Sequence, residues 1–266
     1  MSRLLILILI GFTACRGPLD LSIPNRPGNA PTGAAFYKQV IPLPREEREA
    51  IALREIISGN MPAFLKKFSA IKISMTDSGG NTINAEYYVS PDYLSVGSEA
   101  DFARIPLTPM TAQKIADTFQ CFLPTRKMVN DIYRQAIVQL EPVPLFIHRD
   151  SALIFWHHQL IIEGQRKGRK GLIAGIKKDV VISGKITRDT KPNRVAIYGW
   201  HKPDGNPIQP LYTGHVDWYV DYSHGIRLVY RKIKVNGKWM DYTEVFQHPA
   251  YKALLCDEEF CDCFSY

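Results

Sequence analysis

The sequence predicts an α+β fold, with helices and a small hairpin in the N-terminal half and a mostly antiparallel sheet in the C-terminal half. Three observations carry this prediction. Helix-capping residues precede segments with apolar residues at helical spacing as far as about residue 165. A turn rich in glycine joins two strand-like segments in the same half, and strand-like segments dominate from residue 179 onward.

Capping signals define the expected helices. Pro44 is followed by acidic residues that suit a first helical turn, and Gly59 ends that segment. Thr108, followed by proline, and Thr125 are capping residues for two further helices, and Asp150 or Ser151 caps another. A final short helix is expected after Pro249. The longer helices should cover roughly residues 45–58, 109–119, 126–136 and 151–165, and Asn60 should cap a short helix through Phe68.

The strands are expected from β-branched segments and their turns. A hairpin should join Ile71–Met75 to Thr82–Val89 through the turn 77–81. The pair Asn236-Gly237 is a strong type I′ turn signal, so the strand before it should pair with residues 239–242. Later strands are expected at residues 179–183, 194–200 and 225–233.

The N-terminus has the pattern of an export signal. Arg3 precedes an apolar run, Leu4–Phe12, which is too short to remain as a membrane-spanning helix. The ending Phe12-Thr-Ala-Cys15 resembles the bacterial lipobox, although Phe12 replaces the usual leucine. The resemblance implies cleavage before Cys15 and lipidation of that residue, and Arg16 after it implies the outer membrane. The alternative is a plain signal peptide with an incidental cysteine.

These features divide the chain into three parts. Residues 1–14 form the expected signal peptide, residues 15–35 a lipid-anchored tether rich in proline and glycine, and residues 36–266 one globular domain. The formal net charge is +7, which favours anionic partners such as an envelope polymer or peptidoglycan. No nucleic-acid partner is expected, because no nucleic-acid motif is present.

The segment from Tyr198 to Arg227 is the expected functional site. It lies between two predicted strands and is dense in histidine, aspartate, tyrosine and tryptophan, which is unusual for a simple connection. We expect His224 to be an acid/base group at the start of a strand, with Asp221 or Tyr222 completing the catalytic set by fixing its tautomer. The expected substrate-binding residues are His201, Gln209, His215, Trp218 and Arg227.

Two other interpretations of this segment stay open. His201, His215, Asp217 or Asp221, and His224 could hold a zinc ion, although their spacing matches no zinc motif, and no metal or other cofactor is predicted. Alternatively, the histidines are structural groups satisfied by the backbone.

Other reactive residues give weaker signals. Cys121 could be a nucleophile, but it follows a helix rather than opening one, where the helix dipole would favour a thiolate. In an oxidising compartment, at least one disulfide is expected to join two of Cys121, Cys256, Cys261 and Cys263. The basic run 164–179 is either a solvated loop or an anionic contact surface, with Lys177 or Lys178 reaching the site.

Two segments together resemble a signature of uncharacterised exported bacterial proteins. They are W-H-K-P-D-G-N-P-I-Q-P-L-Y from Trp200 and Y-V-D-Y-S-H-G-I-R-L-V from Tyr219. This resemblance implies a shared fold and site, and it carries no activity. The export signal and the histidine-rich segment together predict a cell-envelope hydrolase with a histidine acid/base, acting on peptidoglycan or another envelope glycan or peptide. The alternative is a non-catalytic lipoprotein that binds a saccharide or peptide through the aromatic segment.

Overall fold

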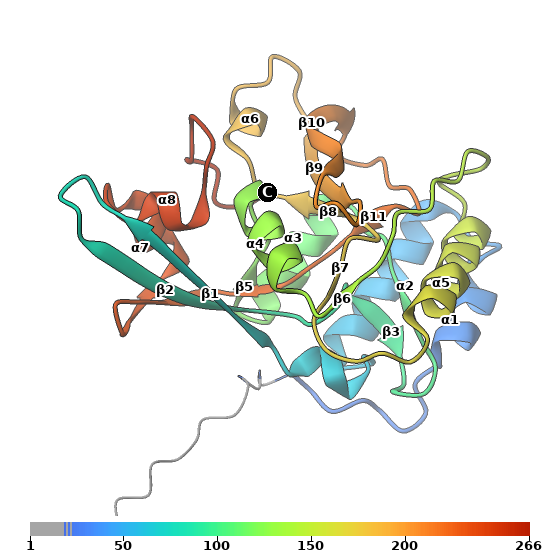
Figure 1. Ribbon diagram of the computed structural model, residues 1–266. Coiled ribbons are helices and arrows are strands. Elements are labelled where there is room, and N and C mark those ends of the chain that lie inside the picture. The colour runs from blue at the N-terminus through green and yellow to red at the C-terminus, as the bar shows by residue number, and fades with distance from the viewer. Residues whose placement is uncertain (1–18, 20, 22) are drawn as a thin grey trace, which may run out of the picture.

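The computed structural model describes residues 19, 21 and 23–266 and has the expected α+β class (Figure 1). The predicted signal peptide, residues 1–14, and Cys15 lie outside the described residues. None of the described helices is long and apolar enough to cross a membrane.

The helices begin where the sequence places their caps. The side chains of Thr32, Thr108, Thr125 and Ser151 each accept a hydrogen bond from a backbone N–H in the first turn of the helix that follows. The longer helices are α1 (Gly33–Val40), α2 (Arg45–Ile57), α3 (Pro109–Thr118), α4 (Arg126–Gln135) and α5 (Ala152–Arg166). The shorter ones are η1 (Ala63–Lys66), α6 (Gly184–Thr187), α7 (Tyr242–Gln247) and α8 (Lys252–Leu255).

The larger sheet joins the two halves of the chain. Within the described residues it has six strands in the order β14-β13-β2-β12-β5, with β1 paired along β2. All its pairs are antiparallel. Its strands are β1 (Ser69–Thr76), β2 (Thr82–Val89), β5 (Cys121–Phe122), β12 (Val229–Tyr230), β13 (Lys232–Val235) and β14 (Lys238–Asp241). Because β2 bonds to strands from the C-terminal end, residues from both halves share one hydrophobic core.

The second sheet holds most of the expected site. Its order is β10-β9-β8-β11, and its strands are β8 (Lys178–Val181), β9 (Arg194–His201), β10 (Pro207–Val216) and β11 (His224–Gly225). Strand β11 pairs parallel with β8, whereas the other pairs are antiparallel. Two small two-stranded sheets complete the fold, formed by β3 (Ser95–Gly97) with β4 (Phe102–Arg104), and by β6 (Val138–Gln139) with β7 (Ile173–Ala174).

Four sequence predictions differ from the observed elements. The helix expected at residues 60–68 is only the short 3-10 helix η1, because strand β1 begins at Ser69. The expected strand 225–233 is divided into β11, β12 and β13, and β11 belongs to a different sheet from the other two. The expected long connection after β9 instead forms β10, which pairs back onto β9 as a hairpin. The strand expected at 239–242 ends at Asp241, because that residue caps α7 with a reciprocal capping box to Glu244.

The segment predicted to be a flexible tether packs on the domain where it is described. Leu19, Leu21 and Ile23 contact the core, and the Phe68 N–H donates to the Leu19 carbonyl. Arg26 donates to the Asn60 side chain and to the carbonyls of residues 30 and 31. The segment is rich in proline, but these three apolar side chains and Arg26 hold its described residues against the domain.

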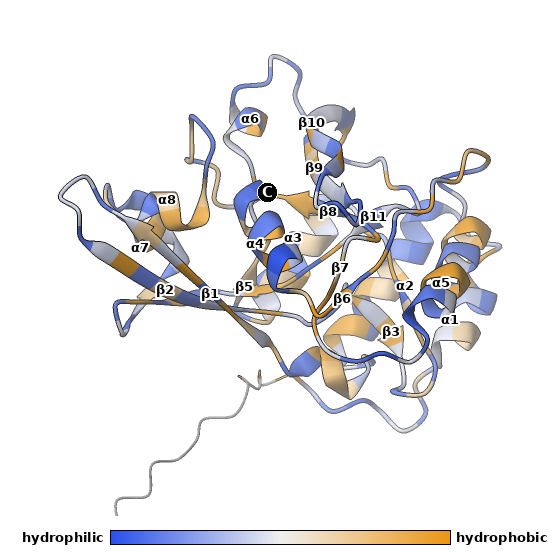
Figure 2. Ribbon diagram, in the orientation of Figure 1, coloured by the Kyte–Doolittle hydropathy of each residue, from blue (hydrophilic) through white to orange (hydrophobic). Residues whose placement is uncertain are grey.

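Apolar residues concentrate where elements meet (Figure 2). Helix α5 is apolar along much of its length, burying Phe155 and Ile162 while leaving Leu153 and Leu160 exposed. Beneath this helix the interior also holds charged groups, among them Asp92, Arg104, Lys177 and Asp179. Burying charges is unfavourable unless they are paired, so their concentration marks the region next to β8 and β11 as one to inspect for function.

Candidate functional site

The parallel pair of β8 and β11 sets the position of His224. His224 lies opposite Lys178, and Gly225 lies opposite Asp179. A Cβ atom on residue 225 would lie 2.5 Å from the Tyr93 ring and 2.7 Å from the Lys177 side chain. Only glycine fits between these groups, so the Ser-His-Gly sequence lets the histidine approach β8 closely.

Strand β9 has an unusual backbone conformation at Gly199 and Trp200, where Trp200 lies against Lys178. Gly199 and Trp200 both have positive φ, 107° and 58°, and positive φ is unfavourable for a bulky residue such as tryptophan. The Trp200 backbone N–H and indole N–H donate to the carbonyls of Lys177 and Ile176. The ammonium of Lys178 then lies 4.7 Å from the centre of the indole ring. This cation–π contact holds Lys178 beside the candidate site.

Asp221 is the most heavily bonded residue of the cluster. Its Oδ1 accepts from the Ser223 N–H at 2.8 Å and from the Ser223 hydroxyl at 2.5 Å. Its Oδ2 accepts from Arg149 at 2.6 Å and from the Tyr219 hydroxyl at 3.3 Å. Burial raises its pKa, but His224, Ser223, Arg149 and Lys178 together lower that pKa to about 2. Asp221 is therefore a fully ionised, buried carboxylate at neutral pH.

His224 faces this carboxylate without a direct hydrogen bond. The His224 Nε2 atom lies 4.0 Å from Asp221 Oδ1, beyond hydrogen-bond distance, and neither ring nitrogen has a partner among the described residues. Burial lowers the pKa of His224 to about 4, despite the opposing effect of Asp221. The ring is therefore neutral at pH 7 and can accept a proton.

Two half-exposed aromatic side chains separate His224 from solvent. The His215 and Tyr219 rings pack at 4.6 Å, and their centres lie 6.4 and 6.0 Å from the His224 ring. His224 itself is 1% exposed. A ligand would reach His224 only if covering side chains such as His215 or Tyr219 moved.

A second layer of buried polar groups supports the cluster from α5. Lys177 donates to the Tyr222 carbonyl, and its Nζ lies 3.2 Å from His158 Nδ1. Burial, with a smaller contribution from nearby cations, lowers the pKa of Lys177 to about 7 and that of His158 to about 2. A neutral His158 can accept a hydrogen bond from Lys177 through Nδ1, so this pair supports the segment that carries Asp221 and His224.

The other expected site residues lie in several places. Tyr222 is buried, and its hydroxyl accepts a hydrogen bond from the Leu145 N–H. The hydroxyl therefore does not bond to His224 and does not fix its tautomer. His201 stacks on Tyr133 and bonds to Asn130 of α4, in a separate group.

The three remaining substrate-binding candidates also lie apart from His224. Gln209 bonds to the neighbouring Pro210 carbonyl, whereas Trp218 is 57% exposed beneath the Arg45 guanidinium. Arg227 is 1% exposed and bonds to the carbonyls of Ser90 and Ile173. Of the expected substrate-binding residues, His215 alone has a described contact with the His224 ring.

The cysteines and possible metal ligands have clear positions. Cys256 and Cys261 form a disulfide, which confirms the expected pairing among the four cysteines, while Cys121 and Cys263 are free and buried. Burial raises the pKa of Cys121, so its thiol is not activated as a nucleophile. Within residues 19, 21 and 23–266, no group of three or more His, Cys, Asp or Glu side chains is arranged to hold a metal.

Several residues of the cluster had no recognisable signal in the sequence. Arg149 and His158 lie more than sixty residues before His224, on the loop before α5 and on α5 itself. Tyr219 was one aromatic among many in its segment. One of the two interpretations of the basic run expects Lys177 or Lys178 to reach the site. Lys178, on β8, lies opposite His224, and Lys177, just before β8, bonds to the Tyr222 carbonyl. Comparisons with protein-family models, curated proteins and solved structures find no match.

Proposed function

We propose that this protein is a cell-envelope hydrolase that acts on peptidoglycan or another envelope glycan or peptide, with His224 as its acid and base. The observation that supports this most is a buried, neutral imidazole whose ring nitrogens have no partner among the described residues, beside the ionised Asp221. A buried polar group without a partner is unfavourable, and such groups are expected where a reaction needs them.

The surrounding groups suit hydrolysis by an activated water. His224 would take a proton from a water molecule while the water oxygen attacks the scissile centre. It would then give that proton to the leaving group. Asp221 lies close enough to stabilise the imidazolium formed between the two steps, although it does not bond to the ring. The cations of Lys178 and Arg149 lie on the same cluster and would stabilise negative charge on the attacked group.

Degradation of envelope polymers tests this proposal. We expect the purified protein to release soluble fragments from at least one of three substrates: peptidoglycan, isolated peptides, or envelope glycans. The products, separated by chromatography and identified by mass, would show which bond is cleaved. A preparation that cleaves none of the three classes would contradict the hydrolase and favour the second candidate.

The second candidate is a non-catalytic envelope lipoprotein that binds a saccharide or peptide. It is favoured by the enclosure of His224 and by the exposed aromatic side chains of Tyr212 and Trp218, which are 43% and 57% exposed. Flat aromatic surfaces suit sugar rings and apolar peptide side chains. Binding without fragment release, measured by co-sedimentation with insoluble peptidoglycan, would distinguish this function from hydrolysis.

We further propose that Cys15 anchors the protein in the envelope, on the outer membrane facing the periplasm or the surface. The variant Cys15→Ala should lose the acyl chains and move from the membrane fraction to the soluble fraction, because stable attachment needs at least two chains. Fractionation followed by detergent partition measures this. Unchanged detergent partition of the variant would reject the anchor.

A further inference from the structure

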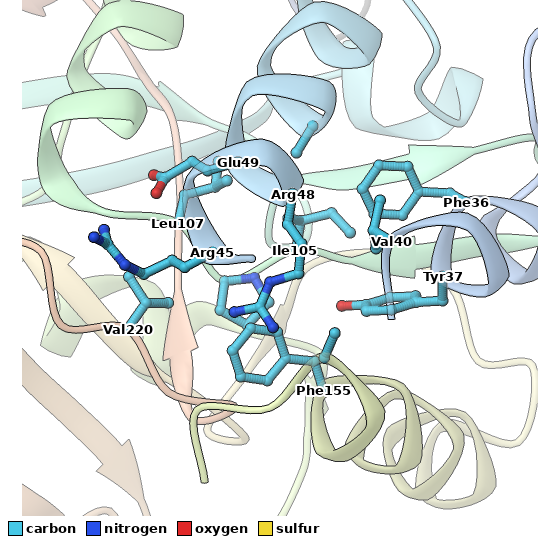
Figure 3. Close-up of a pocket in the computed structure, with 13 residues that line it drawn as sticks. Phe36, Tyr37, Val40, Arg45, Arg48, Glu49, Ile105, Leu107, Phe155 and Val220 are labelled. Atoms are coloured by element: carbon cyan, nitrogen blue, oxygen red, sulfur yellow. The ribbon is translucent and has the colours of Figure 1, made fainter. Parts of the chain in front are cut away.

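A narrow pocket lies beside the candidate site, between α1, α2, α5 and the segment after β4 (Figure 3). Its cavity volume is about 30 Å³, enough for roughly two water molecules and therefore for one small chemical group. Most of its lining is apolar, with Phe36, Val40 and Leu107 among the walls. Val220, the residue before Asp221, closes one side.

Arg48 is one of three charged residues that line this pocket, together with Arg45 and Glu49. Its guanidinium lies over the Phe155 ring at 5.5 Å (Figure 3) and donates one hydrogen bond, of 3.2 Å, to the Asp150 carbonyl. Among the described residues, no carboxylate lies within ion-pair distance of Arg48. Burial lowers the pKa of Arg48, and the neighbouring Arg45 lowers it too, whereas Tyr37, Asp150 and Glu49 oppose this shift.

The neighbouring polar groups leave Arg48 as the available donor. The Glu49 carboxylate accepts from both the backbone and the hydroxyl of Thr108. The Tyr37 hydroxyl donates to the Arg104 carbonyl in the interior. Arg45, which also lines the pocket, pairs with the exposed Glu46. A half-buried guanidinium facing an apolar pocket is best compensated by an anion with apolar neighbours, and a carboxylate fits the guanidinium fork.

The pocket and the candidate site share two chain segments. Arg48 bonds to Asp150, whose neighbour Arg149 pairs with Asp221. Val220 lines the pocket, and Arg45 lies over Trp218 on the same segment. A group held by Arg48 would therefore lie next to the two segments that carry Arg149 and Asp221.

We propose that this pocket binds the carboxylate of a substrate, and that the substrate is a peptide with a free C-terminal carboxylate next to a small apolar side chain. A peptide is favoured over an acidic sugar because the hydroxyls of a sugar would lose their hydrogen bonds against apolar walls. That the ligand is a substrate rests on the proposed hydrolase. The prediction that the pocket binds a carboxylate does not depend on the proposed hydrolase.

Calorimetric titration of the full-length protein tests the pocket, with N-acetyl-alanyl-alanine as the probe and its C-terminal amide as the matched ligand. We expect the acid to bind at least about tenfold more tightly than the amide, since a hydrogen bond to a charged group contributes enough for that ratio. Arg48→Gln should abolish the preference. Arg54→Gln, which removes an exposed arginine of the same helix, should retain it.

The outcomes separate this inference from the proposed function. Three results would each contradict carboxylate binding in this pocket. They are equal affinity for acid and amide, no binding of either at millimolar concentration, and a preference for the acid that survives Arg48→Gln. If Arg48→Gln does not fold, Arg48→Lys, which keeps the charge without the guanidinium fork, should weaken the preference. Methyl glucuronide binding more tightly than the peptide would overturn the choice of a peptide. Tight acid-specific binding without cleavage would support the pocket and reject the hydrolase.

Discussion

Replacing His224 by alanine or glutamine is expected to lower hydrolysis at least about a hundredfold while the protein remains folded. Neither ring nitrogen of His224 has a hydrogen-bond partner among the described residues, so the substitution breaks no bond to them. Glutamine also fills most of the space, which limits the effect of a cavity on stability. The measurements are kcat/KM and thermal melting of the same preparation.

The pH dependence gives a second readout of the same residue. With a pKa of about 4, His224 stays in its proton-accepting form at pH 5, whereas an ordinary histidine would be mostly protonated there. Activity should therefore persist to about pH 5 and fall as the pH approaches 4. An acid limb centred near 6.5 would mean that a solvent-exposed histidine carries the proton instead.

His201→Gln is the matched control. His201 is also buried and its pKa is lowered to about 4 by burial, but its ring bonds to Asn130 and stacks on Tyr133 away from the cluster. This variant should lose stability and keep its activity when folded. If His224→Gln behaved in the same way, His224 would be a structural histidine and the acid/base proposal would fail.

The elements predicted well from sequence are those set by local signals. Thr108, Thr125 and Ser151 cap their helices through contacts within four residues, and the hairpin of β1 and β2 follows from its own turn. Strand pairing over long distances was not predictable. Val229 pairs with both Val89 and Phe122, whereas His224, five residues earlier, pairs with Lys178. No local pattern shows that one apolar run serves two sheets.

The candidate site shows the same division. Asp221, His224 and His215 come from one short segment, so their composition alone suggested that they lie together. The geometry depends on distant residues: Arg149 holds the Asp221 carboxylate, and Trp200, through its positive φ, holds Lys178. Arg227 belongs to the same segment but lies in a different buried cluster, because the chain turns from one sheet to the other after Gly225.

Replacing Asp92 by alanine should lower the free energy of unfolding by about 3–5 kcal/mol, the largest effect on stability that we expect from a single polar substitution. Asp92 is fully buried and accepts from Arg104 Nε at 2.9 Å and from a second guanidinium nitrogen. The variant would leave the buried Arg104 with Gln159 and the half-exposed Glu163 as partners. Urea unfolding at pH 7 measures the change.

The control is a salt bridge on the surface. Asp257→Ala removes the partner of Arg126, whose side chain is 31% exposed, and should change stability by no more than about 1 kcal/mol. An equally small effect for Asp92→Ala would mean that Arg104 finds solvent or another partner. The double variant Asp92→Leu with Arg104→Met removes both charges and should recover much of the loss, because the penalty comes from the unpaired cation. Arg104 lies near His158 and Lys177. The activity of a stable double variant would therefore show whether these two charges also matter to the site or serve the fold alone.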